Sequence, residues 1–469
     1  MWEDQSNLKM KNHSFNKNIL RAYDIRGVVG ESLHYKDAEI LGNIFSSILK
    51  NNNKIIVCRD GRLSSPKMAE HLINGLKDSG SSVIDIGVGP SPMLYFAANL
   101  LKSDGAIMVT GSHNPSNHNG FKIMKGTVPF YGDDIADIGK RANEGNWTLS
   151  PGGSVEEKDL EKKYIESLLK CSKINVINKN IKVVWDSGNG SAGKVMQKLV
   201  NYLPGNHLLL NEKIDGNFPS HHPDPTDPDN LNQLIKLVKK SNSDLGIAFD
   251  GDGDRLGVVS STGDIVWGDQ LIAFLAKEVL KNNPNCSVIA DVKASESIFK
   301  EIKRLGGNPV MWKTGHSFIK SKMKEIAAPL AGEMSGHIFF SDRYYGFDDA
   351  LYAALRVLEL VKNNQTLNNF LESLPKSYAS SEIKISCSDD KKFLVIDELG
   401  KILEKTDSTI IKVDGLRIKK ENGWWLLRAS NTQEALVARI EANSKNNLKL
   451  IRDELKKYLQ KYDLSLENL

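Results

Sequence analysis

One pattern, repeated three times, constrains the fold more than any other feature of the sequence. A β-rich run ends in Asp and leads through a polar turn into a helical stretch at 54–60 (KIIVCRD), 181–186 (IKVVWD) and 286–291 (CSVIAD). Short apolar strands that feed loops and then helices are typical of α/β units. The repeats lie about one domain length apart, which is too far for a solenoid. The sequence therefore predicts three related α/β domains.

The chain has 469 residues, which is too long for one hydrophobic core, because single cores stop growing near roughly 250–300 residues. Turn-rich or polar segments near 143–154, 260–264 and 363–381 indicate boundaries. The remainder, from about Ser381, combines alternating strands with a closing amphipathic helix and predicts a smaller α+β domain. We expect four domains, with the bounds 1–160, 161–263, 264–376 and 377–469.

Composition excludes several classes of protein. The chain is 40% hydrophobic and 26% charged, as an ordinary globular protein is. Its 62 basic and 58 acidic residues are interspersed, so the net charge of +4 predicts no nucleic-acid partner and leaves a small anionic substrate open. No segment has the roughly 20 apolar residues of a membrane span, and the polar N-terminal segment is unlike a signal peptide. Four scattered cysteines without a CxxC pair fit a reducing, cytoplasmic location.

An acidic loop, DGDGDR at 250–255, follows the apolar run Leu245–Phe249. Three carboxylates emerge at a strand end, with glycines between them that let the backbone curl. Oxygen ligands without His or Cys favour Mg²⁺ or Ca²⁺ over zinc. A calcium EF-hand is excluded, because Arg255 and Ser261 stand where that loop needs Gly and Glu. The alternative is a solvated acidic turn, but three aspartates rarely crowd a strand end without a cation.

A serine loop, TGSHNP at 110–115, follows the run Gly105–Val109. It places Ser112 in a tight turn beside His113, where a serine can act as a nucleophile or carry a phosphate. The G-x-S-x-G frame of a hydrolase elbow is absent. An ordinary turn or helix cap would explain this loop equally well if it stood alone. Lys122 follows shortly afterwards and could neutralise a phosphate on the serine.

Two further loops carry groups suited to a sugar phosphate. GEMSGH at 332–337 holds a carboxylate, a hydroxyl and an imidazole that can bind sugar hydroxyls, and a buried hydroxyl without its partner costs roughly 1–3 kcal/mol. RASNT at 428–432 combines a guanidinium with hydroxyls, an amide and backbone N–H groups, which can clasp a phosphate. A plain surface loop is the alternative for the first, and a helix N-cap is compatible with the second.

A glycine-rich turn, GNGSAG at 188–193, satisfies the dinucleotide-binding fingerprint, with Glu212 about 20 residues further on. It is also one residue short of a Walker A loop, because Val195 replaces Ser or Thr. Asp186 stands at the strand end that a pyrophosphate would have to approach, and no nicotinamide chemistry is visible elsewhere. We therefore interpret the turn as a structural strand–turn–helix junction.

Together these segments resemble the α-D-phosphohexomutase superfamily in order and spacing along nearly the whole chain. RAYDIRG at 21–27 is similar to the family's N-terminal motif, TGSHNP to its phosphoserine loop, DGDGDR to its metal loop, GEMSGH to its sugar loop and RASNT to its phosphate loop. DVK at 291–293 and WKTGHS at 312–317 match two further binding segments. Gly111 departs from the Ala of many relatives. Met334 resembles the mannose- and glucose-acting branch, since glucosamine-acting relatives usually carry Gln there.

The resemblance implies an α/β fold of four domains around a central active-site cleft, with three topologically similar α/β domains and a smaller C-terminal α+β domain. It implies an isomerase of the phosphomannomutase/phosphoglucomutase type, which moves a phosphoryl group reversibly between C1 and C6 of mannose or glucose phosphate. A phosphoserine, Mg²⁺ and glucose or mannose 1,6-bisphosphate, as intermediate and activator, would take part. The implied residues are Ser112, His113, Lys122, Arg26, Arg255 and His337 for catalysis, Ser112, Asp250, Asp252 and Asp254 for the metal, and Tyr23, Lys293, His316, Glu333, Ser335, Arg428, Ser430, Asn431 and Thr432 for the substrate.

Several alternatives stay open at this point. His337 or Lys122 could be the general base, and the sequence selects neither the preferred sugar nor monomer or dimer. One alternative is an NAD(P) oxidoreductase built on the glycines at 188–193, and another is a non-catalytic sugar-phosphate sensor. Neither explains why a serine loop, an aspartate triplet and a phosphate-binding segment occur together in one chain. A phosphatase is a closer rival, and the accumulation of free phosphate would distinguish it from a mutase.

Overall fold

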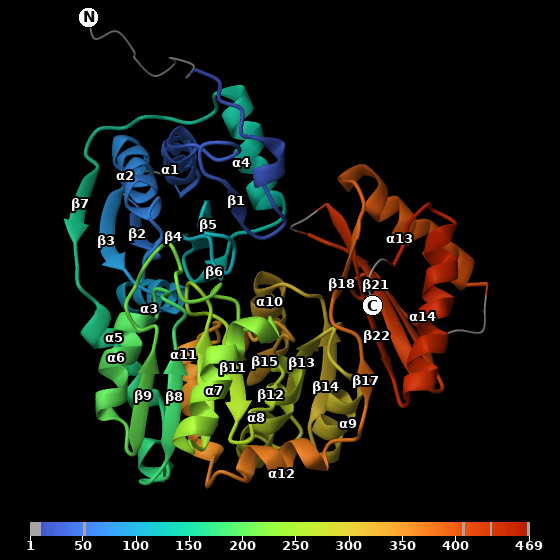
Figure 1. The fold of residues 1–469 in the computed structure, drawn as a ribbon. Coiled ribbons are helices and arrows are strands. Elements are labelled where there is room, and N and C mark those ends of the chain that lie inside the picture. Colours follow the sequence, from blue (N-terminus) through green and yellow to red (C-terminus); the bar gives the residue numbers. More distant parts are fainter. Residues whose placement is uncertain (1–10, 50–52, 406–408, 432–433, 467–469) are drawn as a thin grey trace, which may run out of the picture.

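The structure is a computed structural model that describes residues 11–49, 53–405, 409–431 and 434–466. Four β-sheets follow one another along this part of the chain, and helices pack on each of them (Figure 1). The predicted architecture of three α/β domains and a smaller C-terminal domain is confirmed. None of the described helices is long and apolar enough to cross a membrane.

The first sheet carries the serine loop. Its elements are η1 (Lys17–Ile19), β1 (Ile25–Val28), α1 (Tyr35–Leu49), β2 (Lys54–Arg59), α2 (Ser65–Asp78), β3 (Ser82–Val88), α3 (Ser91–Leu101), β4 (Gly105–Val109), β5 (His118–Lys125), β6 (Val128–Pro129), α4 (Asp133–Glu144) and β7 (Ser154–Glu157). The strand order is β1-β5-β4-β2-β3-β7, with β6 on β5. β4 is parallel to β2, whereas β5 returns antiparallel to β4. The serine loop is therefore the connection of a hairpin at the carboxyl end of a fully buried strand.

The second sheet repeats this arrangement around the aspartate loop. Its elements are α5 (Glu161–Cys171), η2 (Ile174–Val176), β8 (Lys182–Asp186), α6 (Gly193–Leu199), η3 (Val200–Tyr202), β9 (Asn206–Leu210), η4 (Pro228–Leu231), α7 (Asn232–Ser241), β10 (Leu245–Phe249), β11 (Leu256–Ser260) and β12 (Ile265–Val266). The strand order is β12-β11-β10-β8-β9. β10 is parallel to β8 and antiparallel to β11, so the aspartate loop also connects a parallel strand to its returning partner.

The third sheet repeats it again around the GEMSGH loop. Its elements are α8 (Gly268–Asn282), β13 (Ser287–Asp291), α9 (Glu296–Arg304), β14 (Asn308–Trp312), α10 (His316–Ile326), β15 (Leu330–Gly332), β16 (Ile338–Phe340), α11 (Ala350–Leu360) and α12 (Thr366–Ser373). The strand order is β14-β13-β15-β16. β15 is parallel to β13 and antiparallel to β16. Each α/β domain thus presents one functional loop at the same place in its topology.

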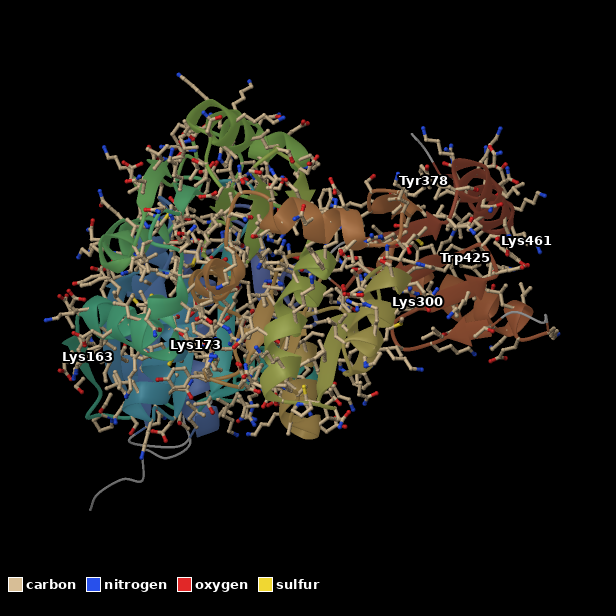
Figure 2. The ribbon with its side chains drawn as sticks, turned by 90° about the horizontal axis from the view of Figure 1, so that it is seen from below. Lys163, Lys173, Lys300, Tyr378, Trp425 and Lys461 are labelled. Carbon is tan, nitrogen blue, oxygen red and sulfur yellow. The ribbon has the colours of Figure 1, made fainter. Side chains whose placement is uncertain are left out.

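The fourth sheet is antiparallel and stands to one side of the other three. Its elements are β17 (Tyr378–Ala379), β18 (Ile383–Ser386), α13 (Asp389–Leu403), β19 (Thr409–Ile411), β20 (Leu416–Lys420), β21 (Gly423–Ala429), β22 (Ala435–Ala442) and α14 (Lys445–Gln460). The order is β17-β22-β21-β20-β19, with β18 also on β22. Viewed from below, Figure 2 shows this domain, with Trp425 and Lys461 labelled, projecting away from the rest. The segment RASNT begins at the end of β21.

Most of the strands and helices expected from the sequence are present. The three repeated runs form β2, β8 and β13, and the closing helix is α14. The helix expected after the glycine turn divides into α6 and the 3-10 helix η3. The domain bounds 1–160, 161–263, 264–376 and 377–469 remain our proposal, with the bound at 263/264 lying inside the hairpin of β11 and β12.

Candidate active site

The three hairpin loops meet, and Ser112 lies where they do. Its side-chain oxygen donates to Asp250 Oδ2 at 3.0 Å, across from the first domain to the second. The same oxygen lies 3.2 Å from Nδ1 of His113. Ser112 is 1% exposed and has a φ of +48°, which is unusual for a residue other than glycine. The loop therefore holds the hydroxyl against the aspartates in a conformation that its surroundings must maintain.

Three buried carboxylates form the centre of the site. Asp250, Asp252 and Asp254 are fully buried, and one oxygen of each lies close enough to the others to hold a metal ion. Asp250 Oδ1 accepts the backbone N–H groups of Asp254 and Arg255, each at 3.1 Å, which fixes the curl of the loop. Asp252 Oδ1 is buried and has no hydrogen-bond partner among the described residues. An all-oxygen donor set with a spare buried oxygen fits a hard divalent cation.

Lys122 supplies positive charge to this centre from β5. Its ammonium donates to Asp252 Oδ2 at 2.6 Å and to Asp254 Oδ2 at 2.5 Å. Burial alone would lower the pKa of Lys122, but the three carboxylates outweigh it and raise the pKa. Burial and the neighbouring Asp252 and Asp254 raise the pKa of Asp250. One ammonium beside three buried carboxylates leaves negative charge that a cation would neutralise.

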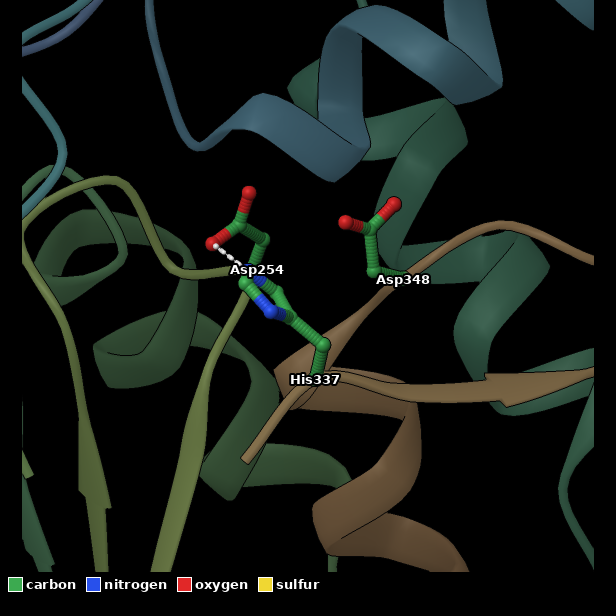
Figure 3. A group of neighbouring side chains, drawn as sticks. All are labelled: Asp254, His337 and Asp348. Atoms are coloured by element: carbon green, nitrogen blue, oxygen red, sulfur yellow. Dashed lines mark hydrogen bonds and ion pairs between the residues drawn. The ribbon is translucent and has the colours of Figure 1, made fainter. Parts of the chain in front are cut away.

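His337 joins the centre to the third domain (Figure 3). Its Nε2 lies 3.2 Å from Asp254 Oδ1, and its Nδ1 lies 2.9 Å from Glu333 Oε2. Burial would lower the pKa of His337, but Asp254 and Glu333 outweigh it and raise the pKa to about 9. Asp348 lies close to Asp254 and His337, and the three form a second buried group that could hold a metal ion. Its carboxylate is paired with Lys320 at 2.9 Å.

A second set of predicted residues lies between the third and fourth domains. Lys293 of the third domain forms an ion pair at 3.0 Å with Glu382 of the fourth domain, so this pair spans the domain junction. Arg428 Nε donates at 2.9 Å to Asp414, which also accepts the backbone N–H of Thr314 from the third domain at 3.1 Å. Arg428, at the start of the predicted phosphate-binding segment, is thereby tied through Asp414 to the loop that precedes α10.

The other predicted residues take the following positions. Arg26 contacts Asn114 of the serine loop at 3.2 Å. Arg255 lies 3.9 Å from Asp224. Ser335 Oγ lies 3.2 Å from His337 Nδ1. The ring of His316 lies edge-on to that of Tyr23, with the centroids 5.4 Å apart, and its Nδ1 lies 3.5 Å from Asp348 Oδ2. Ser430 is buried at the end of β21, and Asn431 follows it directly. Thr432 lies outside the described residues.

The glycine turn supports the aspartate loop rather than a nucleotide. Ser191 donates from both its N–H, at 2.9 Å, and its hydroxyl, at 3.1 Å, to the carbonyl of Gly251. A Cβ added to Gly190 would lie 2.9 Å from the same carbonyl oxygen. The turn is therefore packed against the aspartate loop, which favours the interpretation as a structural junction.

Sequence reasoning missed two residues that lie directly behind the serine loop. Asp60 and Arg62 follow β2, and both are almost fully buried. In the sequence, Asp60 marks only the end of the first repeated β-rich run. One signal could have identified Asp60 and Arg62. They form a charged pair directly after a buried strand, and the strand beside it is also followed by a polar loop.

Comparison with known proteins gives a consistent result. Four models of phosphoglucomutase/phosphomannomutase domains match the chain: alpha/beta/alpha domains I, II and III at residues 17–148, 162–263 and 267–378, and the C-terminal domain at 382–457. A phosphomannomutase/phosphoglucomutase from Pseudomonas putida is 43% identical over 96% of this chain and 97% of its own length. A phosphoglucomutase from Neisseria gonorrhoeae is 41% identical over 95% and 98%.

A solved structure supports the same assignment. The crystal structure of a phosphoglucomutase/phosphomannomutase family protein from Burkholderia thailandensis is 39% identical, covers 94% of this chain and 97% of its own, and has a TM-score of 0.86. The chain belongs to the phosphoglucomutase/phosphomannomutase family. It is a mutase that transfers a phosphoryl group between C1 and C6 of a hexose phosphate, and its family is metal-dependent.

Proposed function

We propose that the protein interconverts the 1- and 6-phosphates of mannose and glucose through a phosphorylated Ser112. The single observation that carries the proposal is the hydroxyl of Ser112, held 3.0 Å from Asp250 within a triplet of buried carboxylates. A phosphoryl group on this oxygen would lie beside the residues that could hold a cation. Phosphoryl transfer depends on positioning and on charge neutralisation, and the site offers both.

Mg²⁺ is the proposed metal, held by Asp250, Asp252, Asp254 and an oxygen of the phosphorylated Ser112. When bound, it would neutralise charge on the transferred phosphoryl group. The protein's own cations act on the same group: Lys122 from the first domain, and Arg255 from the aspartate loop. Their placement around the serine supports a site built to stabilise a phosphoryl group in transfer.

The sugar phosphate would bind across the domains. We propose that Glu333 and Ser335 bind sugar hydroxyls, and that Arg428, with the segment that follows it, holds the phosphate that does not react. Transfer from Ser112 would give a 1,6-bisphosphate, which turns over so that its other phosphate returns to the serine. Glucose or mannose 1,6-bisphosphate would then also serve as the activator that loads Ser112.

The remaining roles are proposed from the resemblance, and the contacts support them. His113 and Arg26 would stabilise the phosphoserine loop, and Tyr23, His316 and Lys293 would line the substrate site between the domains. His337 and Lys122 are both candidates for the proton-transferring group. We also propose a cytoplasmic location, which the four free cysteines support.

Phosphorus NMR provides the direct test. Purified protein with Mg²⁺ and a trace of glucose 1,6-bisphosphate is incubated with mannose 1-phosphate or with glucose 1-phosphate. We expect both to be converted to the 6-phosphate without free phosphate, and the relative rates rank the two sugars. Accumulation of free phosphate would indicate a phosphatase. No conversion of either sugar by the folded protein would refute the proposed substrates.

A further inference from the structure

Arg62 lies beneath the serine loop and donates to its backbone. The residue has 1% of its surface exposed. Its Nη2 donates to the carbonyls of Ser112 at 2.7 Å and Asn114 at 2.6 Å. Its Nη1 donates to the carbonyls of Pro115 at 2.5 Å and His118 at 3.1 Å. One planar guanidinium thus holds four carbonyl oxygens from both arms of a single loop.

Asp60 completes this support from the other side. Its Oδ2 accepts from Arg62 Nε at 3.1 Å, from the Thr110 hydroxyl at 2.8 Å and from the Gly111 N–H at 3.1 Å. The Thr110 hydroxyl in turn accepts the N–H of Ser112 at 2.8 Å. The N–H of Ser112 is therefore linked to Asp60 through one hydroxyl, and its carbonyl is bound by Arg62 directly.

The pair also explains why Gly111 precedes the serine. A Cβ added to Gly111 would lie 2.4 Å from Arg62 Nε, so the guanidinium occupies the space that an alanine would need. Many relatives have Ala where this chain has Gly111, and the position of the Arg62 guanidinium explains the difference in this chain. The loop is held tightly by Arg62 and is not loosened by its glycine.

A residue of the second domain, Phe218, covers one face of the Arg62 guanidinium. The ring of Phe218 lies over Arg62, with the guanidinium carbon 5.1 Å from the ring centroid. Phe218 has a φ of +51°, so two non-glycine residues in left-handed conformations, Phe218 and Ser112, contact this arginine. A Cβ added to Gly251 would lie 2.4 Å from the Ser112 carbonyl oxygen, which shows how closely the aspartate loop packs on the carbonyl that Arg62 binds.

We propose that Asp60 and Arg62 are positioning residues for the transfer reaction, which hold the Ser112 backbone so that its side-chain oxygen stays against the aspartate triplet. The proposal rests on the proposed role of Ser112. Lysine at position 62 keeps the charge but has three donors in a compact group, which cannot replace a guanidinium that spans four carbonyls. Within the described residues, the side-chain hydrogen bonds of Asp60 and Arg62 go to each other, to Ser65 and to residues 110–118, and none reaches the GEMSGH loop. Their loss should therefore reduce turnover and leave substrate affinity unchanged.

The test compares Arg62→Lys with the unmodified protein. Single-turnover loading of Ser112 from ³²P-labelled glucose 1,6-bisphosphate and steady-state conversion of glucose 1-phosphate are both measured, with the labelled residue identified by peptide mass spectrometry. We expect loading and kcat to fall about 100-fold, the loss expected when a reacting group is displaced by about 1 Å, while KM for glucose 1-phosphate stays within about twofold.

Arg356→Lys is the matched control for a general loss of stability. Arg356 is also buried, at 2% exposed, and is paired with Asp342 at 2.8 Å and Glu278 at 2.6 Å, away from the serine loop. It should lower the melting temperature and leave loading and kcat unchanged. A similar fall in kcat in both variants would overturn the proposal, because a structural effect alone would then suffice.

A second pair of variants covers the case in which Arg62→Lys does not fold. Thr110→Ala removes the hydroxyl between Asp60 and the Ser112 N–H, whereas Thr110→Ser keeps it. We expect about a tenfold slower loading in the alanine variant, as for the loss of one or two hydrogen bonds, and recovery in the serine variant. Equal loading in all folded variants would overturn the positioning role alone. Absence of label from Ser112 in the unmodified protein would refute the proposed phosphoserine, and this inference with it.

Discussion

Replacing Lys122 with methionine keeps the length of the side chain and removes an ammonium that contacts the aspartate triplet. In the structure Lys122 pairs with Asp252 at 2.6 Å and with Asp254 at 2.5 Å, and all three groups are almost fully buried. Removing one partner of a buried ion pair costs about 3–5 kcal/mol, because the remaining charge is left without compensation. Lys122→Met should lose stability of this size in the presence of EDTA.

Magnesium should offset much of that loss. With a divalent cation bound, the carboxylates keep a positive partner, and the loss of Lys122 should cost only about 1 kcal/mol, like that of a screened ion pair. The two losses differ by about 2–4 kcal/mol, which corresponds to roughly 30- to 700-fold tighter Mg²⁺ binding by the variant. The variant should bind Mg²⁺ more tightly although it turns over more slowly.

Titration calorimetry with Mg²⁺ after removal of metal by EDTA measures the affinity, and thermal unfolding with EDTA or Mg²⁺ measures the stability. Lys320→Met is the control, because Lys320 is also buried and pairs with Asp348 at 2.9 Å but does not contact the triplet. It should lose stability and keep the Mg²⁺ affinity of the unmodified protein. Equal Mg²⁺ affinity in Lys122→Met and the unmodified protein would refute the reasoning, since the ammonium and the metal would then not share these carboxylates.

Three further changes test other parts of the site. Ser112→Ala should abolish labelling by the bisphosphate and lower conversion more than about a thousandfold without unfolding the protein, since the nucleophilic oxygen is removed; full activity would exclude the phosphoserine. Asp414→Asn should raise KM about tenfold or more with a smaller change in kcat, because Arg428 loses a charged hydrogen bond at 2.9 Å; an unchanged KM would contradict the clamp. Lys293 lowers the pKa of Glu382 from 4.5 to about 2. The ion pair therefore contributes its full stabilisation above about pH 4.5, and this stabilisation is lost as the pH falls towards 2. The melting temperature of Glu382→Gln should therefore fall below that of the unmodified protein at pH 6, and the gap should narrow by pH 3; a gap independent of pH would count against the pairing.

The positions of the functional loops could be predicted because the sequence marks most of them twice. The serine and aspartate loops each combine an unusual cluster of polar residues with an apolar run that directly precedes it, as in the run before Asp250, whereas the GEMSGH loop was recognised by its polar cluster alone. A strand end and a chemical motif together locate a group at the carboxyl edge of a sheet. The sequence does not show that the strand after each loop pairs antiparallel with the strand before it, because this pairing depends on hydrogen bonds between segments.

The supporting residues could not be predicted in the same way. Arg62 and Lys320 resemble surface residues in the sequence, since charged side chains are rarely buried without a partner. Their partners are carbonyls of the serine loop and the Asp348 carboxylate, about 50 and 28 positions away along the chain. Only the folded chain brings Lys320 to its carboxylate and Arg62 to the serine-loop carbonyls. The carboxylate that pairs with Arg62, Asp60, lies two positions away and is the one local sign of its burial.

The repeated hairpin gives a reason for the division of labour among the domains. Three loops at equivalent topological positions carry the serine, the carboxylates and the proposed sugar-binding groups, and one continuous core of buried residues runs through their domains. The fourth domain has its own core and meets the third through a small buried group of Val292, Trp424 and Leu426. Groups that must keep their geometry to within an ångström thus share a core. We propose that the segment beginning at Arg428 holds the phosphate that does not react, and it lies on the fourth domain, which has a core of its own. Movement of a domain with a separate core would let this segment release one end of a bisphosphate and take up the other.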